Sequence, residues 1–119
     1  MPSFNYSIDM FTSNGAQKLI TLLMIDTVWI CGNSPSTTSG PPKHASAAEE
    51  KAAQEYLAAF EQKLAVVANT SVPYILVAGH FPVFSIAEHG PTQCLVEKLR
   101  PLLHKYGVSA YFSGHDHGL

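Results

Sequence analysis

Six histidines stand out in this chain of 119 residues, because imidazole both titrates near neutrality and binds transition metals readily. Three follow apolar stretches: His80 comes directly after Gly79, and His115 and His117 belong to the sequence GHDH. A glycine before His80 and before His115 allows a sharp turn and the close approach of an ion. In an extended segment His115 and His117 would point to the same side, so both could reach one ion or two adjacent ions. Imidazole suits iron, zinc, copper or manganese in sites with mixed nitrogen and oxygen ligands.

The alternative for any one of these histidines is a hydrogen bond to a backbone carbonyl at the end of a strand. For the three together we favour a metal site. A dinuclear hydrolytic site also needs carboxylates that bridge and neutralise two cations, and candidates are few. We interpret Asp26 as a turn or capping carboxylate. Asp116, between two histidines, is interpreted as a residue that orients a ligating imidazole or holds the loop.

The elements that must position these histidines are alternating strands and helices, which makes the fold class α/β. Apolar runs and helical spacing predict strand, helix, strand, helix and strand over residues 18–27, 47–68, 72–79, 91–106 and 108–113. Ser46, three residues before Glu49, predicts the cap of the first helix, and Pro101 predicts a kink in the second. This order implies parallel strands with right-handed crossovers, and ligands bind at the carboxyl ends of such strands.

Composition excludes several functional classes. The formal net charge is -2, and charged residues make up 13% of the chain, about half of the roughly 25% in average proteins. Lysines and arginines are scattered singly, so we expect no nucleic-acid partner. Since no apolar run approaches the ~20 residues that a bilayer requires, we expect no membrane span. Residues 1–119 are treated as one domain, with an exposed loop over residues 32–45, where Gly, Asn, Ser, Pro and Thr dominate.

The compartment stays open on these residues alone. Cys31 and Cys94 fit a buried free pair as well as a disulfide. Asn5 and Asn69 begin glycosylation sequons, Asn-Tyr-Ser and Asn-Thr-Ser, but such short motifs also occur by chance in cytosolic chains.

Three segments together resemble a known family. They are MIDTVWICGNS (24–34), YILVAGHFPVFSIAEHGPTQCLVEKLRPLL (74–103) and YFSGHDH (111–117). They are similar to the purple acid phosphatases, calcineurin-like metallophosphoesterases, and in particular to the small animal members known as tartrate-resistant acid phosphatases. The resemblance implies part of an αββα sandwich. It also implies an acid phosphatase that hydrolyses phosphate monoesters by a metal-bound hydroxide at a dinuclear iron or iron–zinc site. The expected cofactors are Fe(III) and a divalent metal, which is Fe(II), Zn or Mn.

The resemblance assigns roles to individual histidines. His80 and His115 match ligands of the divalent metal, and His117 matches a ligand of the ferric ion. His89 matches a catalytic residue that contacts the substrate phosphate and assists proton transfer. His44 lies in the polar loop and His104 on the expected solvent side of the second helix, so we expect replacement of either to leave metal content and activity unchanged.

The cysteines and the polar loop also acquire an interpretation. Cys31 and Cys94 match the family's disulfide, which favours a secreted or lysosomal protein, and a monomer is expected. The loop over residues 34–46 falls where the family carries an exposed, protease-sensitive loop that represses activity. No acidic residue lies between Cys31 and Glu49, which puts an inhibitory carboxylate in doubt.

The remaining metal ligands of the family come from three motifs, D-x-G, G-D-x-x-Y and G-N-H, and none occurs ahead of Met24. We therefore expect the C-terminal part of a catalytic domain: a fragment, a partial gene model or a truncated isoform. The competing hypothesis is a non-catalytic chain that binds metal weakly or binds nothing.

Overall fold

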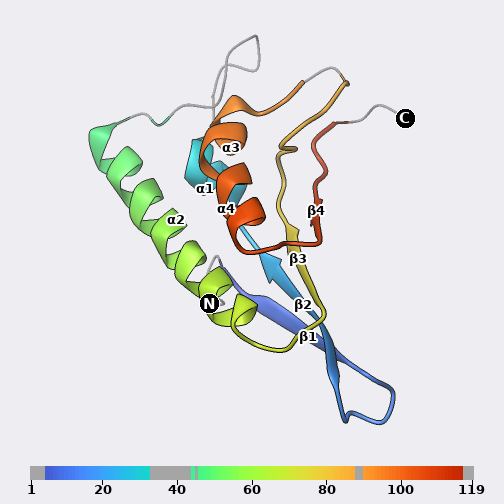
Figure 1. Cartoon of the computed structure of the whole chain (residues 1–119). Helices are drawn as coiled ribbons and strands as arrows, with labels where there is room; N and C mark the ends of the chain where they lie inside the picture. The colour runs from blue at the N-terminus through green and yellow to red at the C-terminus, as the bar shows by residue number, and fades with distance from the viewer. Residues whose placement is uncertain (1–4, 33–43, 45, 88–89, 117–119) are drawn as a thin grey trace.

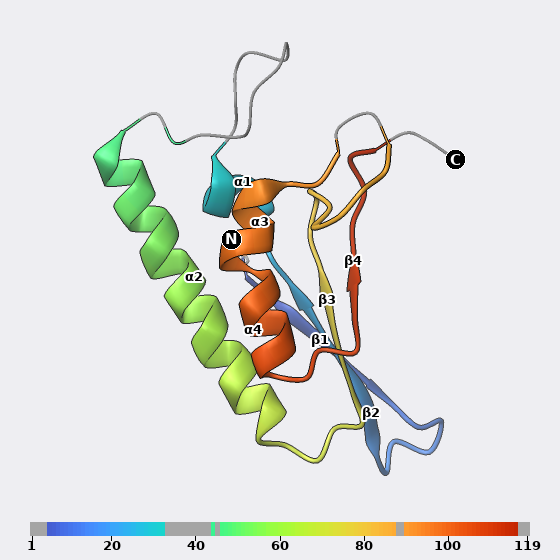
Figure 2. The same ribbon diagram turned by 45° about the horizontal axis from the view of Figure 1, so that its top comes forward.

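The computed structural model describes residues 5–32, 44, 46–87 and 90–116. These ranges contain β1 (Ser7–Phe11), β2 (Lys18–Met24), α1 (Thr27–Cys31), α2 (Ala47–Ala68), β3 (Tyr74–Ala78), α3 (Gln93–Lys98), α4 (Arg100–Lys105) and β4 (Ala110–Phe112). The four strands form one mixed sheet, and the helices lie on one side of it (Figures 1 and 2). None of the described helices is both long and apolar enough to cross a bilayer.

The strands lie in the order β1-β2-β3-β4. β2 pairs with β3, and β3 with β4, in parallel, which confirms the prediction from the alternating elements. β1 was not predicted, and it pairs with β2 in antiparallel fashion. A tight connection joins the two strands, where the Thr12 N–H donates to the Gln17 carbonyl at 2.8 Å and Gly15 has a positive φ of 69°. The dipeptide Asn14-Gly15 is a known hairpin signal and could have revealed this turn.

The helices differ from the prediction near Asp26 and Pro101. α2 has the predicted bounds, and the Ser46 hydroxyl accepts from the Glu49 N–H at 3.2 Å. The strand predicted over 18–27 ends at Met24, because Asp26 caps the unpredicted α1. The helix predicted over 91–106 is divided at Leu99 into α3 and α4, since Pro101 lacks the N–H that an unbroken helix requires.

The core lies between the helices and the sheet. Its fully buried side chains include Leu23 and Val77 from the sheet, with Ile30, Phe60, Leu64, Leu95 and Leu99 from the helical side. A disulfide joins Cys31, at the end of α1, to Cys94 in α3, with a sequence separation of 63 residues. In the chain-entropy model, closing a loop of this size stabilises a protein by roughly 4 kcal/mol.

The opposite side of the sheet is apolar on every strand. Because cross-strand partners point to the same face, Ile8, Leu22, Leu76 and Ala110 form one row across the sheet. The neighbouring rows contain Met10, Ile20 and Tyr74 on one side, and Tyr6, Met24, Ala78 and Phe112 on the other. We call this set the open face, because no described helix covers it (Figure 2).

The exposed loop predicted over residues 32–45 is buried at its first residue and mostly buried at His44. Gly32 is buried, and the His44 side chain is only 11% exposed. The other residues of that prediction lie outside the described residues.

Candidate metal centre

His80 and His115 lie beyond the carboxyl ends of the neighbouring strands β3 and β4. Backbone hydrogen bonds hold the two segments together past the end of the ladder. The Gly79 N–H donates to the Phe112 carbonyl at 3.0 Å, and the Gly114 N–H donates to the His80 carbonyl at 3.1 Å. Parallel pairing therefore places residues from distant parts of the sequence at one edge of the sheet.

The two imidazoles contact each other directly. His115 Nδ1 and His80 Nε2 are 3.0 Å apart, and the rings meet edge to face with centroids 4.9 Å apart. A hydrogen bond between two ring nitrogens needs one donor and one acceptor, so at least one of the imidazoles is neutral in this arrangement.

His115 has a strained backbone. Its φ is 73°, and the Asp116 N–H donates to the Gly114 carbonyl at 2.9 Å, which makes His115 the centre of a γ-turn with positive φ. Such conformations cost of order 1–3 kcal/mol and cluster at functional sites. The extended geometry assumed for His115 and His117 is therefore wrong at His115, while His117 lies outside the described residues.

The two ring nitrogens are close to the separation that a shared metal ion requires. Zinc–nitrogen bonds are about 2.0–2.1 Å long, so two imidazoles on one tetrahedral ion place their nitrogens about 3.3–3.4 Å apart. The observed 3.0 Å is a hydrogen-bond distance, and a separation of a few tenths of an ångström more would allow both nitrogens to bind one ion. Within the described ranges, no group of three or more His, Cys, Asp or Glu side chains is placed to hold a metal. His89, the predicted substrate-binding histidine, lies outside these ranges, as does His117.

Asp26 has the capping role that the sequence favoured. Its carboxylate accepts from the Trp29 N–H at 3.0 Å, and its own N–H donates to the Tyr56 hydroxyl at 2.7 Å. Burial raises the pKa of Tyr56 to about 12, so the hydroxyl stays protonated over the physiological range. Asp26 thus fixes the start of α1.

Three residues at the turn after β3 were not predicted as site residues: Thr27, Phe81 and Tyr111. The Thr27 hydroxyl accepts from the Phe81 N–H, and the Tyr111 hydroxyl donates to the Phe81 carbonyl. Burial raises the pKa of Tyr111, which keeps this hydroxyl a donor. No local pattern reveals such contacts, because they join three separate elements.

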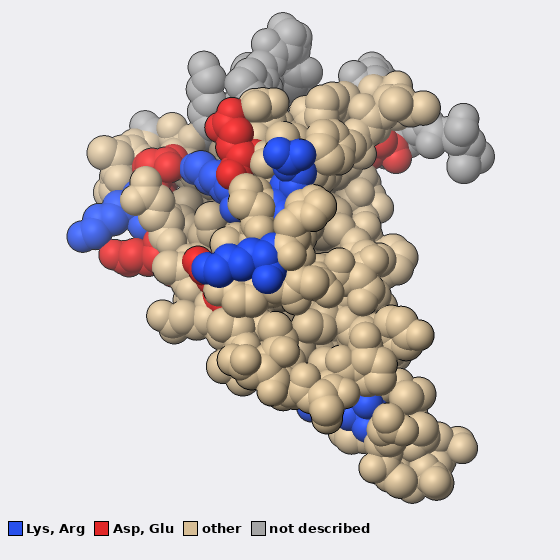
Figure 3. All heavy atoms as spheres, viewed as in Figure 1, with Lys and Arg blue, Asp and Glu red and all other residues tan. Residues whose placement is uncertain are grey.

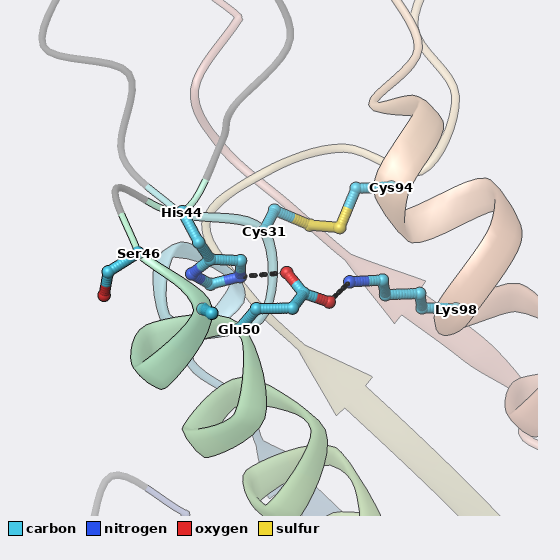
Figure 4. A pocket seen from close by; sticks show the side chains of 7 residues that line it. Cys31, His44, Ser46, Glu50, Cys94 and Lys98 are labelled. Atoms are coloured by element: carbon cyan, nitrogen blue, oxygen red, sulfur yellow. Dashed lines mark hydrogen bonds and ion pairs between the residues drawn. A yellow bond between two sulfur atoms is a disulfide. The ribbon is translucent and has the colours of Figure 1, made fainter.

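A second polar cluster lines a cavity of about 420 Å³ beside the disulfide (Figure 4). His44 Nε2 lies 2.8 Å from the Ile30 carbonyl oxygen and 3.5 Å from the Glu50 carboxylate. Lys98 Nζ donates to the same carboxylate at 2.9 Å, and this bond is the main cause that lowers the pKa of Glu50. His44 therefore has structural contacts, and its expected silence in metal binding and activity stays a prediction. His104 is exposed on α4, in keeping with that expectation.

The family model for calcineurin-like phosphoesterases matches residues 4–119. The chain belongs to this family. Among curated relatives, the chain is 51% identical over 100 residues to tartrate-resistant acid phosphatase type 5 of Oryctolagus cuniculus, and 49% identical over 100 residues to that of Homo sapiens. Each alignment covers 84% of this chain and 29% of the relative. Purple acid phosphatase 17 of Arabidopsis thaliana is 48% identical over 44 residues, which are 37% of this chain and 13% of the relative.

A solved structure supports the fold. It is described as GAP50, the anchor in the inner membrane complex of Plasmodium, and superimposes on this chain with a TM-score of 0.71 at 23% identity. The superposition covers 98% of this chain and 33% of that one. Together with the family match, this superposition confirms the metallophosphoesterase fold expected from the sequence. The chain spans less than a third of the length of the acid phosphatases it matches.

Proposed function

We propose that this chain is the part of an acid phosphatase catalytic domain that supplies imidazole ligands to a dinuclear metal site. The observation that carries the proposal is the His80–His115 pair, whose ring nitrogens are 3.0 Å apart beyond two strand ends. The strained γ-turn at His115 adds support, because a backbone conformation of this cost needs a compensating reason. The similarity to acid phosphatases supports the proposed reaction class, hydrolysis of phosphate monoesters.

The roles of the four histidines follow from this proposal. His80 and His115 would hold the divalent metal, which is Fe(II), Zn or Mn, and His117 would bind Fe(III). When bound, two such ions act as Lewis acids and neutralise negative charge on a phosphate ester. His89 would contact the substrate phosphate and donate a proton to the leaving oxygen. The Gly79 N–H donates to Phe112 of β4, and the Gly114 N–H donates to the His80 carbonyl. These two bonds keep the segments that carry His80 and His115 side by side.

The disulfide supports a secreted or lysosomal location. Disulfides persist in oxidising compartments and are rare in the cytosol. Cys31 and Cys94 are joined in this structure, and no free cysteine occurs among the described residues. We further propose that the protein is a glycoprotein. We also propose that it is a monomer when its open face is covered.

The second candidate function is metal binding without turnover. It is favoured by the described part of the chain, which brings together two imidazoles and no larger set of metal-binding side chains. Two cations a few ångströms apart repel each other unless a bridging carboxylate and further anionic ligands neutralise them. We therefore propose that the 119-residue chain by itself is colourless, binds at most one divalent ion and has no phosphatase turnover.

The test uses the purified chain and Zn²⁺ as the probe. Zn²⁺ titration calorimetry should detect one weak site in the wild type, and His80→Ala and His115→Ala should abolish it. His104→Ala is the matched control, because His104 is exposed on α4, and it should bind like the wild type. An aryl phosphate assay at acidic pH, with iron and zinc supplied, should stay at background.

Two results would contradict these proposals. The metal site would be refuted if His80→Ala and His115→Ala bound Zn²⁺ as tightly as the wild type. Turnover that disappears in His117→Ala would refute the metal-binding-only proposal and show that this segment completes an active site by itself.

A further inference from the structure

Side-chain hydroxyls hold both backbone polar groups of Phe81. The Phe81 N–H donates to Thr27 Oγ1 at 2.9 Å, and its carbonyl accepts from the Tyr111 hydroxyl at 2.7 Å. Thr27 is the fully buried first residue of α1, and Tyr111 belongs to β4. Two elements that are far apart in the sequence therefore fix one residue of the turn after β3.

Phe81 in turn contacts both imidazoles. It directly follows His80, and its ring meets the His115 ring edge to face with centroids 4.8 Å apart. The Phe81 side chain is 7% exposed and belongs to the core, so it cannot move without disturbing the packing. A displacement of Phe81 would move His80 through the backbone and His115 through the ring contact.

The space around Gly79 shows how closely these groups are packed. A Cβ atom at Gly79 would lie 2.6 Å from Thr27 Cγ2 and 2.6 Å from the Tyr111 hydroxyl oxygen. The two side chains that hold Phe81 therefore also enclose the residue before His80. Their hydroxyls leave little freedom to the turn from Gly79 to Phe81.

We propose that Thr27 and Tyr111 are positioning residues for the His80–His115 pair. Their two hydroxyls fix the Phe81 backbone, and this keeps the two imidazoles in an orientation in which both can bind one metal ion. This inference rests on the proposed metal site and adds to it the residues that set its geometry. Changes to residues that orient metal ligands typically reduce metal affinity by about 10–100-fold.

The experiment compares three variants at these positions. Thr27→Val removes the hydroxyl at nearly constant volume, Thr27→Ser keeps it, and Tyr111→Phe removes one oxygen atom. We expect Thr27→Val and Tyr111→Phe to weaken Zn²⁺ binding about tenfold, and Thr27→Ser to restore wild-type affinity. Tyr111→Phe deletes the least and keeps the test available if Thr27→Val does not fold.

A matched control separates positioning from general stability. Thr21 is also buried, at 3% exposure, and its hydroxyl donates to Asp9 at 2.7 Å, so Thr21→Val removes a comparable bond away from the histidines. Thr21→Val should lower the thermal midpoint but leave Zn²⁺ affinity unchanged. A purely structural role for Thr27 would make the two valine variants alike, and that result would overturn the inference.

A measurement on the metal-free chain keeps this inference distinct from the proposed function. Nuclear Overhauser contacts between the Phe81 and His115 rings should be present in the wild type and Thr27→Ser, and reduced in Thr27→Val and Tyr111→Phe. Absence of Zn²⁺ binding in the wild type would refute the metal site alone. Unchanged ring contacts in both hydroxyl-free variants would refute the positioning role.

Discussion

Gly79 precedes the candidate ligand His80, and its lack of a side chain also matters for the stability of the fold. Because a Cβ there would lie 2.6 Å from two other side chains, Gly79→Ala forces Thr27 or Tyr111 to move. Overpacking of this kind costs typically 1–3 kcal/mol. We expect a destabilisation in that range, measured by urea unfolding. Gly114→Ala is the control, since a Cβ there would meet no atom of the described residues within 4 Å, and an equal loss in both variants would show that packing is not the cause.

The two sequon asparagines differ in accessibility. Asn5 is 7% exposed, its side chain accepts a hydrogen bond from Tyr56, and its carbonyl accepts from Lys63 at 2.7 Å. Asn69 is exposed at the carboxyl end of α2. A bulky glycan requires a surface position, so we expect Asn69 to be modified and Asn5 to remain bare in protein secreted from eukaryotic cells. Glycopeptide mass spectrometry decides this, and a glycan on Asn5 in folded protein would contradict it.

At the scale of elements, Glu61 connects α2 to the end of α4. Its carboxylate accepts from Lys105 at 2.7 Å and from the Tyr106 hydroxyl at 2.9 Å, and these bonds lower its pKa below the ordinary 4.5. A carboxyl with a lowered folded-state pKa contributes stability above its unfolded pKa. That contribution is lost as the pH falls through the folded value.

Glu61→Gln should therefore lower the thermal midpoint at neutral pH, and the difference from the wild type should shrink as the pH falls below 4.5. Glu55→Gln is the control, because Glu55 pairs with Lys51 of the same helix at 3.9 Å and forms no ion pair with another element among the described residues. A difference for Glu61→Gln that is constant from neutral to strongly acidic pH would show that the carboxylate charge does not contribute.

Local signals predicted some elements and missed others for physical reasons. α2 was predictable because its cap, Ser46 with Glu49, lies within one turn of the helix it begins. β1 was missed because its alternation of polar and apolar residues is short. This alternation indicates a strand only in combination with the Asn14-Gly15 turn. The end of β2 was misplaced because the apolar run continues past Met24, and the capping bond of Asp26 is what stops the strand.

The candidate site shows the same division. The proximity of His80 and His115 could be predicted, since each follows an apolar strand and parallel strands bring their ends together. The γ-turn at His115 could not, because a positive φ is uncommon for any residue other than glycine. The hydroxyl bonds from Thr27 and Tyr111 were equally hidden, because each joins residues that are 30 or more positions apart in sequence.

At the scale of the whole molecule, charge and apolar surface are separated. Charged side chains gather over the helices, whereas the end formed by β1 and β2 shows few (Figure 3). On the open face, Tyr6, Ile8, Met10, Tyr74 and Phe112 are 41–56% exposed. Contiguous exposed apolar surface marks an interaction site or an aggregation hazard.

We expect the isolated chain to bind a hydrophobic dye and to scatter more light as its concentration rises. Ile8→Lys combined with Met10→Lys should reduce both signals, because the two charges lie on the open face. Ser7→Lys is the control, since Ser7 lies on the same strand with its side chain on the opposite face. Dye binding that is equal in all three proteins would show that the open face is not the source.

The mixed pairing of the sheet also affects the order in which its strands pair during folding. β1 and β2 are joined by a short turn, and hairpins form in about 1–10 μs. Ile20 and its parallel partner Tyr74 are separated by nearly half the chain, so that pairing must await the much slower closure of a long loop through α2. During this interval the second edge of β2 is unpaired and can capture another chain. We therefore expect refolding yield to fall with protein concentration, and the early hairpin to be the species that is lost to association.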